Sequence, residues 1–297
     1  MTTAVLTERR RAERLPAAIR ALRPRQWTKN LLLFAGLLFS GRLDDVSSWL
    51  AATTAYAAFC LVSSGCYLLN DLHDVDADRL HPTKRLRPIA AGELGRRRAL
   101  LLAGLLAPAG LVLGAVLGWE TLALLGGFAA VQLAYTFGLK RLAFIDVLVI
   151  AGLFVLRAAA GAAAVGVRIS PWLLVCTSLL ALFLALAKRR AELARVGAER
   201  SVGRAALDRY SLPLADRLVH AAAFASIAVY ALYGFQSPEA AMAITIPLVA
   251  VGVCRYLFVT QYRELGEEPE QVLLSDPVLI GAVLCWVALA ATLLAKP

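Results

Sequence analysis

The strongest constraint in this sequence is a series of nine apolar runs, each roughly 17–25 residues long. The runs cover residues 26–42, 47–69, 98–118, 120–138, 143–167, 171–188, 218–235, 240–260 and 276–295. A helix of this length crosses the hydrocarbon core of a bilayer. The strand alternation of a membrane β-barrel is absent, so we expect an all-α integral membrane protein with about nine transmembrane helices.

The first run gives the weakest helix prediction, because polar residues crowd its start and its continuous apolar part, residues 31–39, is short. The alternative is an interfacial segment that does not fully cross the membrane. Arg25 and Lys29 stand where this run meets the membrane surface, and they are candidate substrate-binding residues. Cations beside Trp27 are equally typical of an interfacial belt.

Lysine and arginine residues indicate which side of the membrane each connection occupies. Of 31 such residues, 27 fall in alternate connecting segments, and cytoplasmic segments are the ones that retain cations. We therefore expect a cytoplasmic N-terminus, cytoplasmic loops at 70–98 and 188–217, and a C-terminus on the far side. Residues 1–24 form a basic arm, and residues 25–297 form a single transmembrane domain. The net charge of +10 then reports topology, and it does not indicate a nucleic-acid partner because aromatic residues are not interleaved with the cations.

The segment NDLHDVDAD, which begins at Asn70, concentrates acids at the cytoplasmic end of the second run. On a continuous helix, with about 100° per residue, Asp71, Asp74 and Asp78 fall within about 60° of one another. Asp76 points to the opposite side. Converging carboxylates require a cation, and oxygen ligands suit Mg²⁺, which commonly bridges to substrate phosphates. The spacing predicts a Mg²⁺–diphosphate site, and the alternative is a set of solvated acids that pair with nearby cations.

The cations that follow, Lys84, Arg85 and Arg87, are candidate ligands for substrate phosphates. Arginine offers a planar fork for bidentate phosphate contacts, and lysine offers a compact charge. The alternative is that these residues serve only as a cytoplasmic retention signal.

Polar residues also stand where the fourth and fifth runs meet the cytoplasm: Tyr135, Lys140 and Asp146. An acid at the membrane edge is often functional, although Asp146 is also placed to pair with Lys140 or Arg141. Arg157 lies deeper, within the fifth run. A cation at that depth has to face an acid, a carbonyl group or a wet cavity, and Arg157 is therefore a candidate for a substrate cavity.

The sixth run ends in the sequence KRRAEL, which begins at Lys188. Lys188 and Glu192 are i,i+4 neighbours that are able to form an ordinary helix pair, and Arg189 lies beside them. We expect this cluster to face the aspartates and to contribute to substrate binding.

These features resemble the UbiA superfamily of membrane prenyltransferases. The resemblance rests on nine helices, the NDxxDxxxD motif at the end of the second span, and the segments RPRQWTKN, QLAYTFGLKR and ELGEEPEQVLLSDPVL. It implies a helical bundle around a central cavity that opens to the cytoplasm, and a Mg²⁺-dependent transferase acting on a diphosphate. Usual members carry a second Asp-rich motif after the sixth span, where this chain has KRRAEL.

The resemblance is strongest to a branch of the family in which the lipid is the acceptor. It implies that polyprenyl phosphate attacks phosphoribosyl diphosphate, that diphosphate leaves, and that the product feeds arabinan synthesis at a bacterial plasma membrane. The first alternative is prenyl transfer from a prenyl diphosphate to an aromatic or lipid acceptor. The second is a lipid-binding or transport protein without catalysis. A homo-oligomer is compatible with the sequence.

Overall fold

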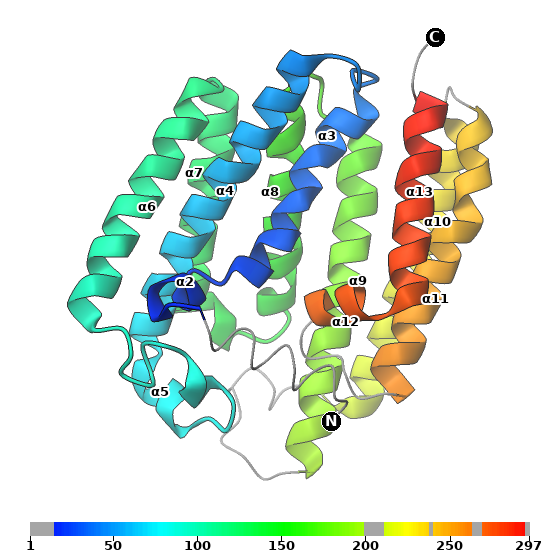
Figure 1. The fold of residues 1–297 in the computed structure, drawn as a ribbon. Helices are drawn as coiled ribbons and strands as arrows, with labels where there is room; N and C mark the ends of the chain where they lie inside the picture. The colour runs from blue at the N-terminus through cyan, green and yellow to red at the C-terminus, as the bar shows by residue number, and fades with distance from the viewer. Residues whose placement is uncertain (1–14, 199–210, 238–239, 263–268, 295–297) are drawn as a thin grey trace.

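The structure is a computed structural model that describes residues 15–198, 211–237, 240–262 and 269–294. Its elements are α2 (Ala17–Ala21), the 3-10 helix η1 (Pro24–Leu33), α3 (Phe34–Phe39), α4 (Val46–His73), α5 (Val75–Leu80), η2 (Lys84–Leu86), α6 (Arg96–Val116), α7 (Trp119–Phe137), η3 (Leu139–Arg141), α8 (Ile145–Ala164), α9 (Pro171–Ala198), α10 (Leu212–Gln236), η5 (Ala240–Thr245), α11 (Ile246–Tyr262), α12 (Pro269–Ser275) and α13 (Pro277–Leu294). The described residues contain no strand, and the long helices run side by side along one direction (Figure 1). The all-α prediction is confirmed.

Eight segments of the described chain are long and apolar enough to cross a membrane. They correspond to the second to ninth predicted runs. The first run is a broken segment in which η1 continues directly into α3. A 3-10 helix rises about 2.0 Å per residue and an α-helix about 1.5 Å, so these 16 residues extend roughly 29 Å, close to the thickness of a hydrocarbon core. The expected number of about nine spans therefore agrees with eight helices and one broken segment.

Close backbone packing holds the broken segment against α8. A Cβ atom on Gly161 of α8 would lie 2.1 Å from the carbonyl oxygen of Leu33, and a Cβ atom on Gly36 would lie 2.4 Å from the backbone of Ala162. Only glycine permits this approach, and small residues at helix contacts are the usual way to pack helices in a membrane. The contact fixes η1 against the centre of the bundle.

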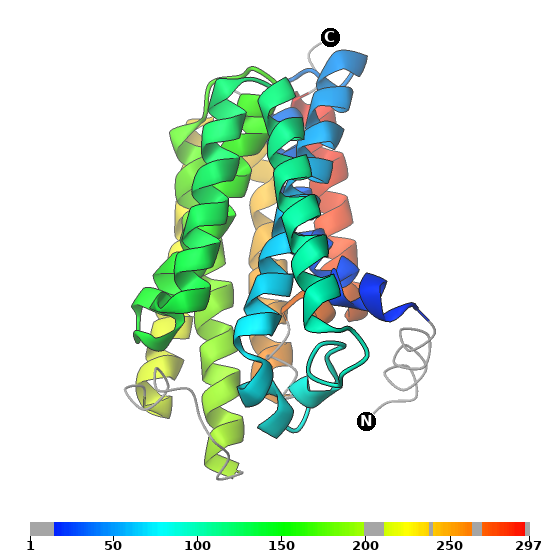
Figure 2. The ribbon, with the colours of Figure 1, turned by 90° about the vertical axis from the view of Figure 1, so that its left-hand side faces the viewer.

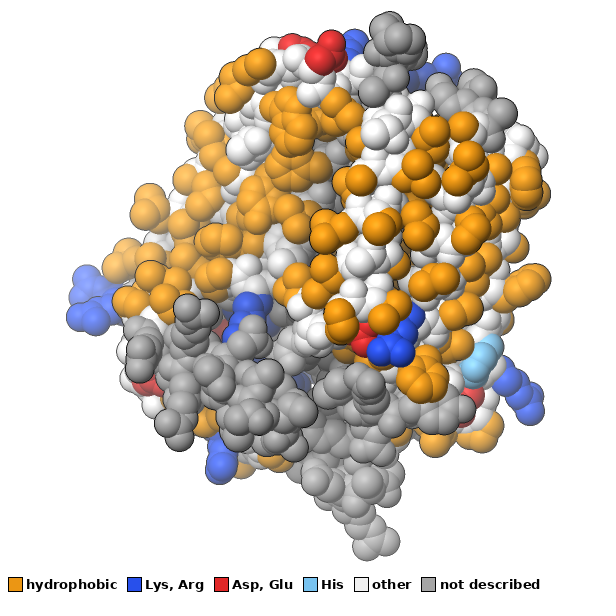
Figure 3. Space-filling view, turned by 45° about the vertical axis from the view of Figure 1, so that its right-hand side comes forward, with side chains coloured by type: hydrophobic (Ala, Val, Ile, Leu, Met, Phe, Trp, Pro, Cys, Tyr) orange, Lys and Arg blue, Asp and Glu red, His pale blue; other side chains and the backbone are white. Residues whose placement is uncertain are grey.

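Most of the described Lys and Arg residues lie at one end of the bundle. The short elements α2, α5 and α12 all lie toward this end (Figures 1 and 2), together with the cytoplasmic segments predicted from the sequence. Among the described cations, Arg42 and Arg168 lie at the opposite end, in the α3–α4 and α8–α9 connections. On the face shown in Figure 3, hydrophobic side chains cover the middle of the surface between the two ends.

Two predicted boundaries are wrong. Helix α9 continues ten residues beyond the expected start of the loop at 188, to Ala198, and α10 begins at Leu212 rather than after 217. Hydropathy marks only the apolar part of a helix, whereas Lys, Arg and Glu are good helix formers and extend α9 beyond it. Part of the predicted basic arm is also ordered, because Ala21 of α2 is buried in a core cluster with Leu68 of α4. Residues 1–14 lie outside the described chain.

Candidate functional site

The acidic motif lies at a break between two helices. Helix α4 ends at His73, α5 begins at Val75, and Asp74 between them has φ −93° and ψ 6°. Asp74 N–H still donates to the carbonyl oxygen of Asn70 at 2.9 Å. The continuous helix assumed across the motif is therefore wrong, and α5 turns so that Asp78 is buried.

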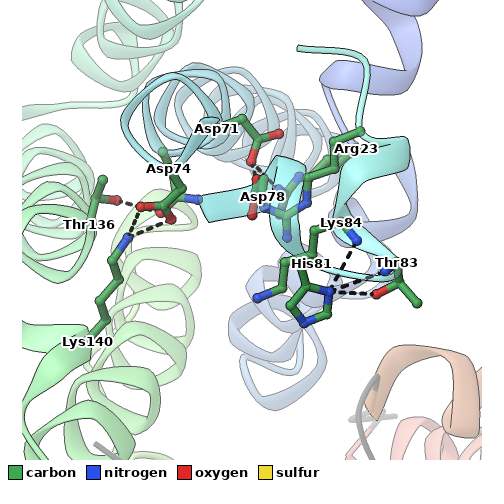
Figure 4. A network of polar contacts seen from close by, with 11 residues as sticks. Arg23, Asp71, Asp74, Asp78, His81, Thr83, Lys84, Thr136 and Lys140 are labelled. Carbon is green, nitrogen blue, oxygen red and sulfur yellow. Dashed lines mark hydrogen bonds and ion pairs between the residues drawn. The ribbon is translucent and has the colours of Figure 1, made fainter. Parts of the chain in front are cut away.

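Asp71 and Asp78 share one guanidinium group. Nη1 of Arg87 lies 3.2 Å from Asp71 Oδ1 and 2.6 Å from Asp78 Oδ2, and Arg23 also pairs with Asp71 Oδ1. Asp71 is 2% exposed and Asp78 is 4% exposed. These two carboxylates thus face one another across cations from two other segments of the chain (Figure 4).

Asp74 lies on the other side of the motif. Lys140 Nζ contacts both of its carboxylate oxygens at 2.6 Å, and Figure 4 shows this pair apart from Asp71 and Asp78. Thr136 of α7 donates a 3.3 Å hydrogen bond to the side-chain oxygen of Asn70. The end of α7 and the start of the α7–α8 connection therefore line this side of the site.

The remaining charged residues of the segment are divided between the site and solvent. Lys84 lies near enough to Asp78 to interact with its charge. Arg85 is exposed, and within the described chain no side-chain contact joins it to the other candidate residues. The side chain of Asp76 is 87% exposed and lies 3.4 Å from Arg79, in agreement with its predicted position away from the other acids.

Burial opposes charge on both members of the Arg87–Asp78 pair. Burial raises the pKa of the Asp78 carboxyl above its ordinary value, and the nearby charge of Arg87 acts against that rise. Burial likewise lowers the pKa of the Arg87 guanidinium, with a further contribution from Arg23, while Asp71 and Asp78 oppose the shift. Keeping both members of this buried pair charged therefore costs desolvation free energy, and the charge of a bound ligand is able to offset that cost.

The donor atoms of the motif suit Mg²⁺, but their arrangement is not a closed metal site. Three carboxylates and the amide oxygen of Asn70 form an all-oxygen set of the kind that Mg²⁺ prefers. Within the described residues, no three Asp, Glu, His or Cys side chains are close enough together to hold a metal ion. The predicted convergence of three carboxylates on one point is thus not observed, because Asp74 turns to Lys140.

A second charged cluster joins α7, α8 and α9. Arg189 is 1% exposed, and its Nε lies 2.6 Å from Asp146 Oδ2, although this contact lacks the alignment of a hydrogen bond. Arg189 also pairs with Glu192 and donates a 3.2 Å hydrogen bond to the Tyr135 hydroxyl. The expectation that this cluster faces the motif aspartates is wrong for Arg189, because Asp146 and Glu192 occupy its guanidinium. Asp146 likewise pairs with Arg189 rather than with Lys140.

Arg157 lies inside the bundle at 3% exposure. Its Nε donates to the side-chain oxygen of Asn30 at 2.8 Å, and its Nη1 donates to the Leu153 carbonyl oxygen at 2.9 Å. The sequence predicted an acid, a carbonyl group or a wet cavity beside Arg157, and the structure supplies a carbonyl and an amide oxygen.

Three further candidates lie toward the end of the bundle that carries the acidic motif. Arg25 is exposed on η1, and Lys29 pairs with Gln26. Lys188 lies on α9 beside Arg189. The structure does not test whether these residues bind substrate, and their roles stay predictions.

Sequence reasoning missed two residues that contact the motif. Arg23 directly precedes η1 with a left-handed backbone, φ 55°, and it reaches Asp71. Thr136 follows Tyr135 in the same motif and reaches Asn70. Each lies next to residues that were selected, so a search of all polar residues in RPRQWTKN and QLAYTFGLKR would have included them.

The chain matches known proteins along most of its length. Residues 31–275 match the model of the UbiA prenyltransferase family. The chain is 37% identical to decaprenyl-phosphate phosphoribosyltransferase of Mycolicibacterium smegmatis, over 91% of this chain and 89% of that protein. It is 36% identical to the protein of the same name from Corynebacterium glutamicum, over 91% and 84%.

A solved structure shares the fold. The UbiA homolog from Archaeoglobus fulgidus, bound to DMAPP and Mg²⁺, superposes with a TM-score of 0.72 at 19% identity, covering 94% of this chain and 99% of that chain. At this identity the likeness concerns the fold alone. It agrees with the helical bundle expected from the sequence.

Proposed function

This chain belongs to the UbiA prenyltransferase family, and from that premise we propose that it transfers 5-phosphoribosyl from phosphoribosyl diphosphate to polyprenyl phosphate, with release of diphosphate and with Mg²⁺ as cofactor. The relatives from Mycolicibacterium smegmatis and Corynebacterium glutamicum, which carry the name of this activity, support the proposal because they align over most of both chains.

The observation that carries the proposal is the charge at the start of the cytoplasmic part of α9. Usual family members have a second acidic motif there, whereas this chain has Lys188, Arg189 and Arg190. Arg189 is enclosed by acids of its own cluster. Among the described residues, the NDxxDxxxD motif is the Asp-rich motif of this end, and Arg23, Arg87 and Lys140 contact its carboxylates. This arrangement favours a donor that brings several phosphate groups to a single metal site.

The reaction needs little acid–base chemistry from the protein. The phosphate oxygen of the lipid is already an anion, so it is able to attack the anomeric carbon without a strong general base. The new bond joins this oxygen to the anomeric carbon, and the bond from that carbon to the diphosphate breaks. The electron pair of the broken bond leaves on the diphosphate. Attack from the face opposite the leaving group inverts the configuration.

Asp71, Asp74 and Asp78 are the residues proposed to hold Mg²⁺. When bound, the metal would polarise the diphosphate and neutralise the charge that develops as it leaves. Solved neighbours of this fold bound to Mg²⁺ support a divalent metal.

We propose that the cations that neutralise the motif bind the phosphate groups of the substrates. Arg23, Arg87 and Lys140 each contact a motif carboxylate, and each lies within reach of an anion bound at those carboxylates. Arginine forks suit phosphate oxygens. Lys84 and Lys188 are further candidates at the same end of the bundle.

Prenyl transfer from a prenyl diphosphate is the second candidate. The solved neighbour bound to DMAPP supports it, because it shows that the fold accommodates a prenyl diphosphate. The sequence KRRAEL counts against it, because it stands where usual members carry a second Asp-rich motif.

The proposed setting is a bacterial plasma membrane with the active site on the cytoplasmic side. The end of the bundle that carries the motif also carries most of the described cations, and cations mark the cytoplasmic side. The ribosyl lipid would then serve as a precursor for cell-wall arabinan.

The deciding experiment uses membranes that contain the full chain. Labelled phosphoribosyl diphosphate and polyprenyl phosphate are added with and without Mg²⁺, and the lipid fraction is examined for a labelled ribosyl lipid. We expect the product only with Mg²⁺. Transfer from a prenyl diphosphate to an aromatic acid, without any ribosyl lipid, would establish the second candidate instead.

A further inference from the structure

Two cationic side chains are fully buried among the described residues, and they have opposite surroundings. Arg189 lies between the carboxylates of Asp146 and Glu192. Arg157 has no carboxylate within ion-pair distance in the part of the chain that is described. A buried cation without a counter-charge is costly in a low-dielectric interior. Arg157 thus carries an uncompensated positive charge deep inside the described bundle.

Neutral groups hold the guanidinium of Arg157 in place. The amide oxygen of Asn30 accepts a hydrogen bond from Nε, and the Leu153 carbonyl oxygen accepts one from Nη1. The centre of the guanidinium also lies 4.6 Å from the ring centroid of Phe128 and 5.4 Å from that of Phe154. These contacts stabilise and orient the cation, but they leave its charge uncompensated. Such a site favours an incoming anion.

A row of polar residues links Arg157 to the acidic motif. On α4, Cys60, Ser64, Tyr67 and Asp71 recur at i, i+4, i+7 and i+11, so they share one face of the helix. We call these four residues the polar seam. Tyr67 and Cys60 both interact electrostatically with Arg157. The end of the polar seam away from Asp71 therefore borders the buried cation, and we call it the inner end.

Arg23 and the helix η1 that follows it place polar side chains against the polar seam. Asn30 donates to Cys60 Sγ at 3.3 Å, and Trp27 donates to Ser64 Oγ at 3.1 Å. The guanidinium of Arg23 lies 5.1 Å from the Tyr67 ring centroid and pairs with Asp71. A polar path therefore runs along α4 from the motif to Arg157, through a region that in a membrane bundle is otherwise apolar.

We propose that Arg157, oriented by Asn30, forms a buried subsite for a phosphate monoester at the inner end of the polar seam. Two groups of the proposed reaction have this chemistry: the 5-phosphate of phosphoribosyl diphosphate and the phosphate of the lipid acceptor. In the donor, the 5-phosphate and the diphosphate stand at opposite ends of the ribose, so one molecule is able to present a phosphate to each end of the seam. The inference rests on the proposed function, because that function supplies both phosphate monoesters.

The sharpest test is Asn30→Asp in the full chain, reconstituted in lipid nanodiscs. This substitution keeps the shape of the side chain and gives Arg157 a carboxylate partner, so it cancels the net charge without opening a cavity. Binding is measured by calorimetry with three probes in the presence of Mg²⁺: phosphoribosyl diphosphate, inorganic diphosphate and a short-chain polyprenyl phosphate. Thermal unfolding is measured in parallel.

We expect Asn30→Asp to weaken the binding of one phosphate monoester by about 30-fold or more, while the unfolding temperature stays the same or rises. Inorganic diphosphate should bind as in the unsubstituted protein. Arg157→Met should weaken the binding of the same probe. Arg42→Met serves as the matched control, since it removes a cation that also donates to a backbone carbonyl, Val165 at 3.2 Å, at the far end of the bundle. This control should bind all three probes normally.

The probe that weakens identifies the source of the phosphate. Selective loss of phosphoribosyl diphosphate assigns the subsite to the 5-phosphate, and selective loss of polyprenyl phosphate assigns it to the lipid. Unchanged binding of both monoesters by Asn30→Asp would overturn the subsite, as would equal loss of inorganic diphosphate. If the unsubstituted protein binds neither monoester, both the proposed function and the subsite fail. If it binds them and the variant does too, only the subsite fails.

Discussion

Lys140 contacts both carboxylate oxygens of Asp74 at 2.6 Å, and this contact divides the acidic motif into two parts. Asp74 belongs to the side lined by the end of α7, whereas Asp71 and Asp78 belong to the side shared by Arg23 and Arg87. Each part couples carboxylates to cations from a different segment of the chain. The geometry of the motif therefore depends on contacts with several elements and not on α4 alone.

Replacing Asp74 should abolish turnover, whereas replacing Asp76 should have little effect. Asp74→Asn removes a proposed metal ligand and the partner of Lys140, so we expect a loss of about 100-fold or more in phosphoribosyl transfer. Asp76 has an 87% exposed side chain, and Asp76→Asn should stay within about twofold because its surface ion pair is weak. Rates are measured in membranes with equal amounts of each variant. Equal losses from the two substitutions would contradict this division of the motif.

As the pH is lowered, the affinity for Mg²⁺ should begin to fall at a higher pH than it would if Asp78 had the pKa of an ordinary aspartate. Burial raises the pKa of Asp78 above its ordinary value, so the folded protein binds this proton more tightly than the unfolded chain does. This group therefore lowers stability as the pH rises from the ordinary pKa of an aspartate through the folded pKa of Asp78. Metal binding requires the ionised form, so Mg²⁺ affinity should increase across the same window. Calorimetric titration of Mg²⁺ at several pH values measures this.

Arg87 provides the control for the pH dependence. Its charge lowers the pKa of Asp78, so Arg87→Gln should raise that pKa and move the loss of Mg²⁺ affinity to higher pH. Arg85→Gln changes the net charge equally but removes an exposed side chain, and it should leave the pH profile in place. A profile that is identical in the Arg87 variant and the unsubstituted protein would show that Asp78 does not control metal binding.

Hydropathy was sufficient to predict the eight long spans, because a bilayer requires long apolar helices. It was less informative for the first run, where the 3-10 helix η1 precedes α3 and extends further per residue than an α-helix does. Hydropathy also placed the end of α9 too early, because Lys188 and the charged residues after it continue the helix beyond the apolar run. Helix continuity depends on propensity and packing, and hydropathy does not report either.

The residues of the candidate site were easier to predict than their partners. The motif spacing selected Asp71, Asp74 and Asp78, yet a continuous helix was the wrong geometry because the chain breaks at Asp74. The partners Arg23 and Lys140 come from distant segments, and tertiary packing brings them to the motif. Asn30 beside Arg157 is a contact between η1 and α8, 127 residues apart in sequence, and no local pattern predicts a pairing of that kind.

Gly161→Ala should destabilise the protein through the contact between α8 and η1. The added Cβ would stand 2.1 Å from the Leu33 carbonyl oxygen, so backbone has to move, and we expect a cost of about 1–3 kcal/mol or more in unfolding free energy. Gly152→Ala on the same helix is the matched control, since its Cβ would meet nothing within 4 Å and alanine favours a helix. Thermal unfolding in detergent compares the two variants. A similar unfolding temperature for both would show that η1 does not depend on this contact.

Arg189→Met should destabilise the bundle rather than only weaken substrate binding. The substitution leaves Asp146 and Glu192 without their shared cation, and Asp146 is fully buried. Removing one partner of a buried ion pair typically costs about 3–5 kcal/mol. Arg190→Met breaks the more exposed pair with Asp216, and it should cost less than about 1 kcal/mol. Adding Asp146→Asn and Glu192→Gln to Arg189→Met removes the unpaired charges, so the unfolding temperature should recover in large part. A normal unfolding temperature for Arg189→Met, combined with a raised KM, would instead identify Arg189 as a substrate ligand, as the sequence alone suggested.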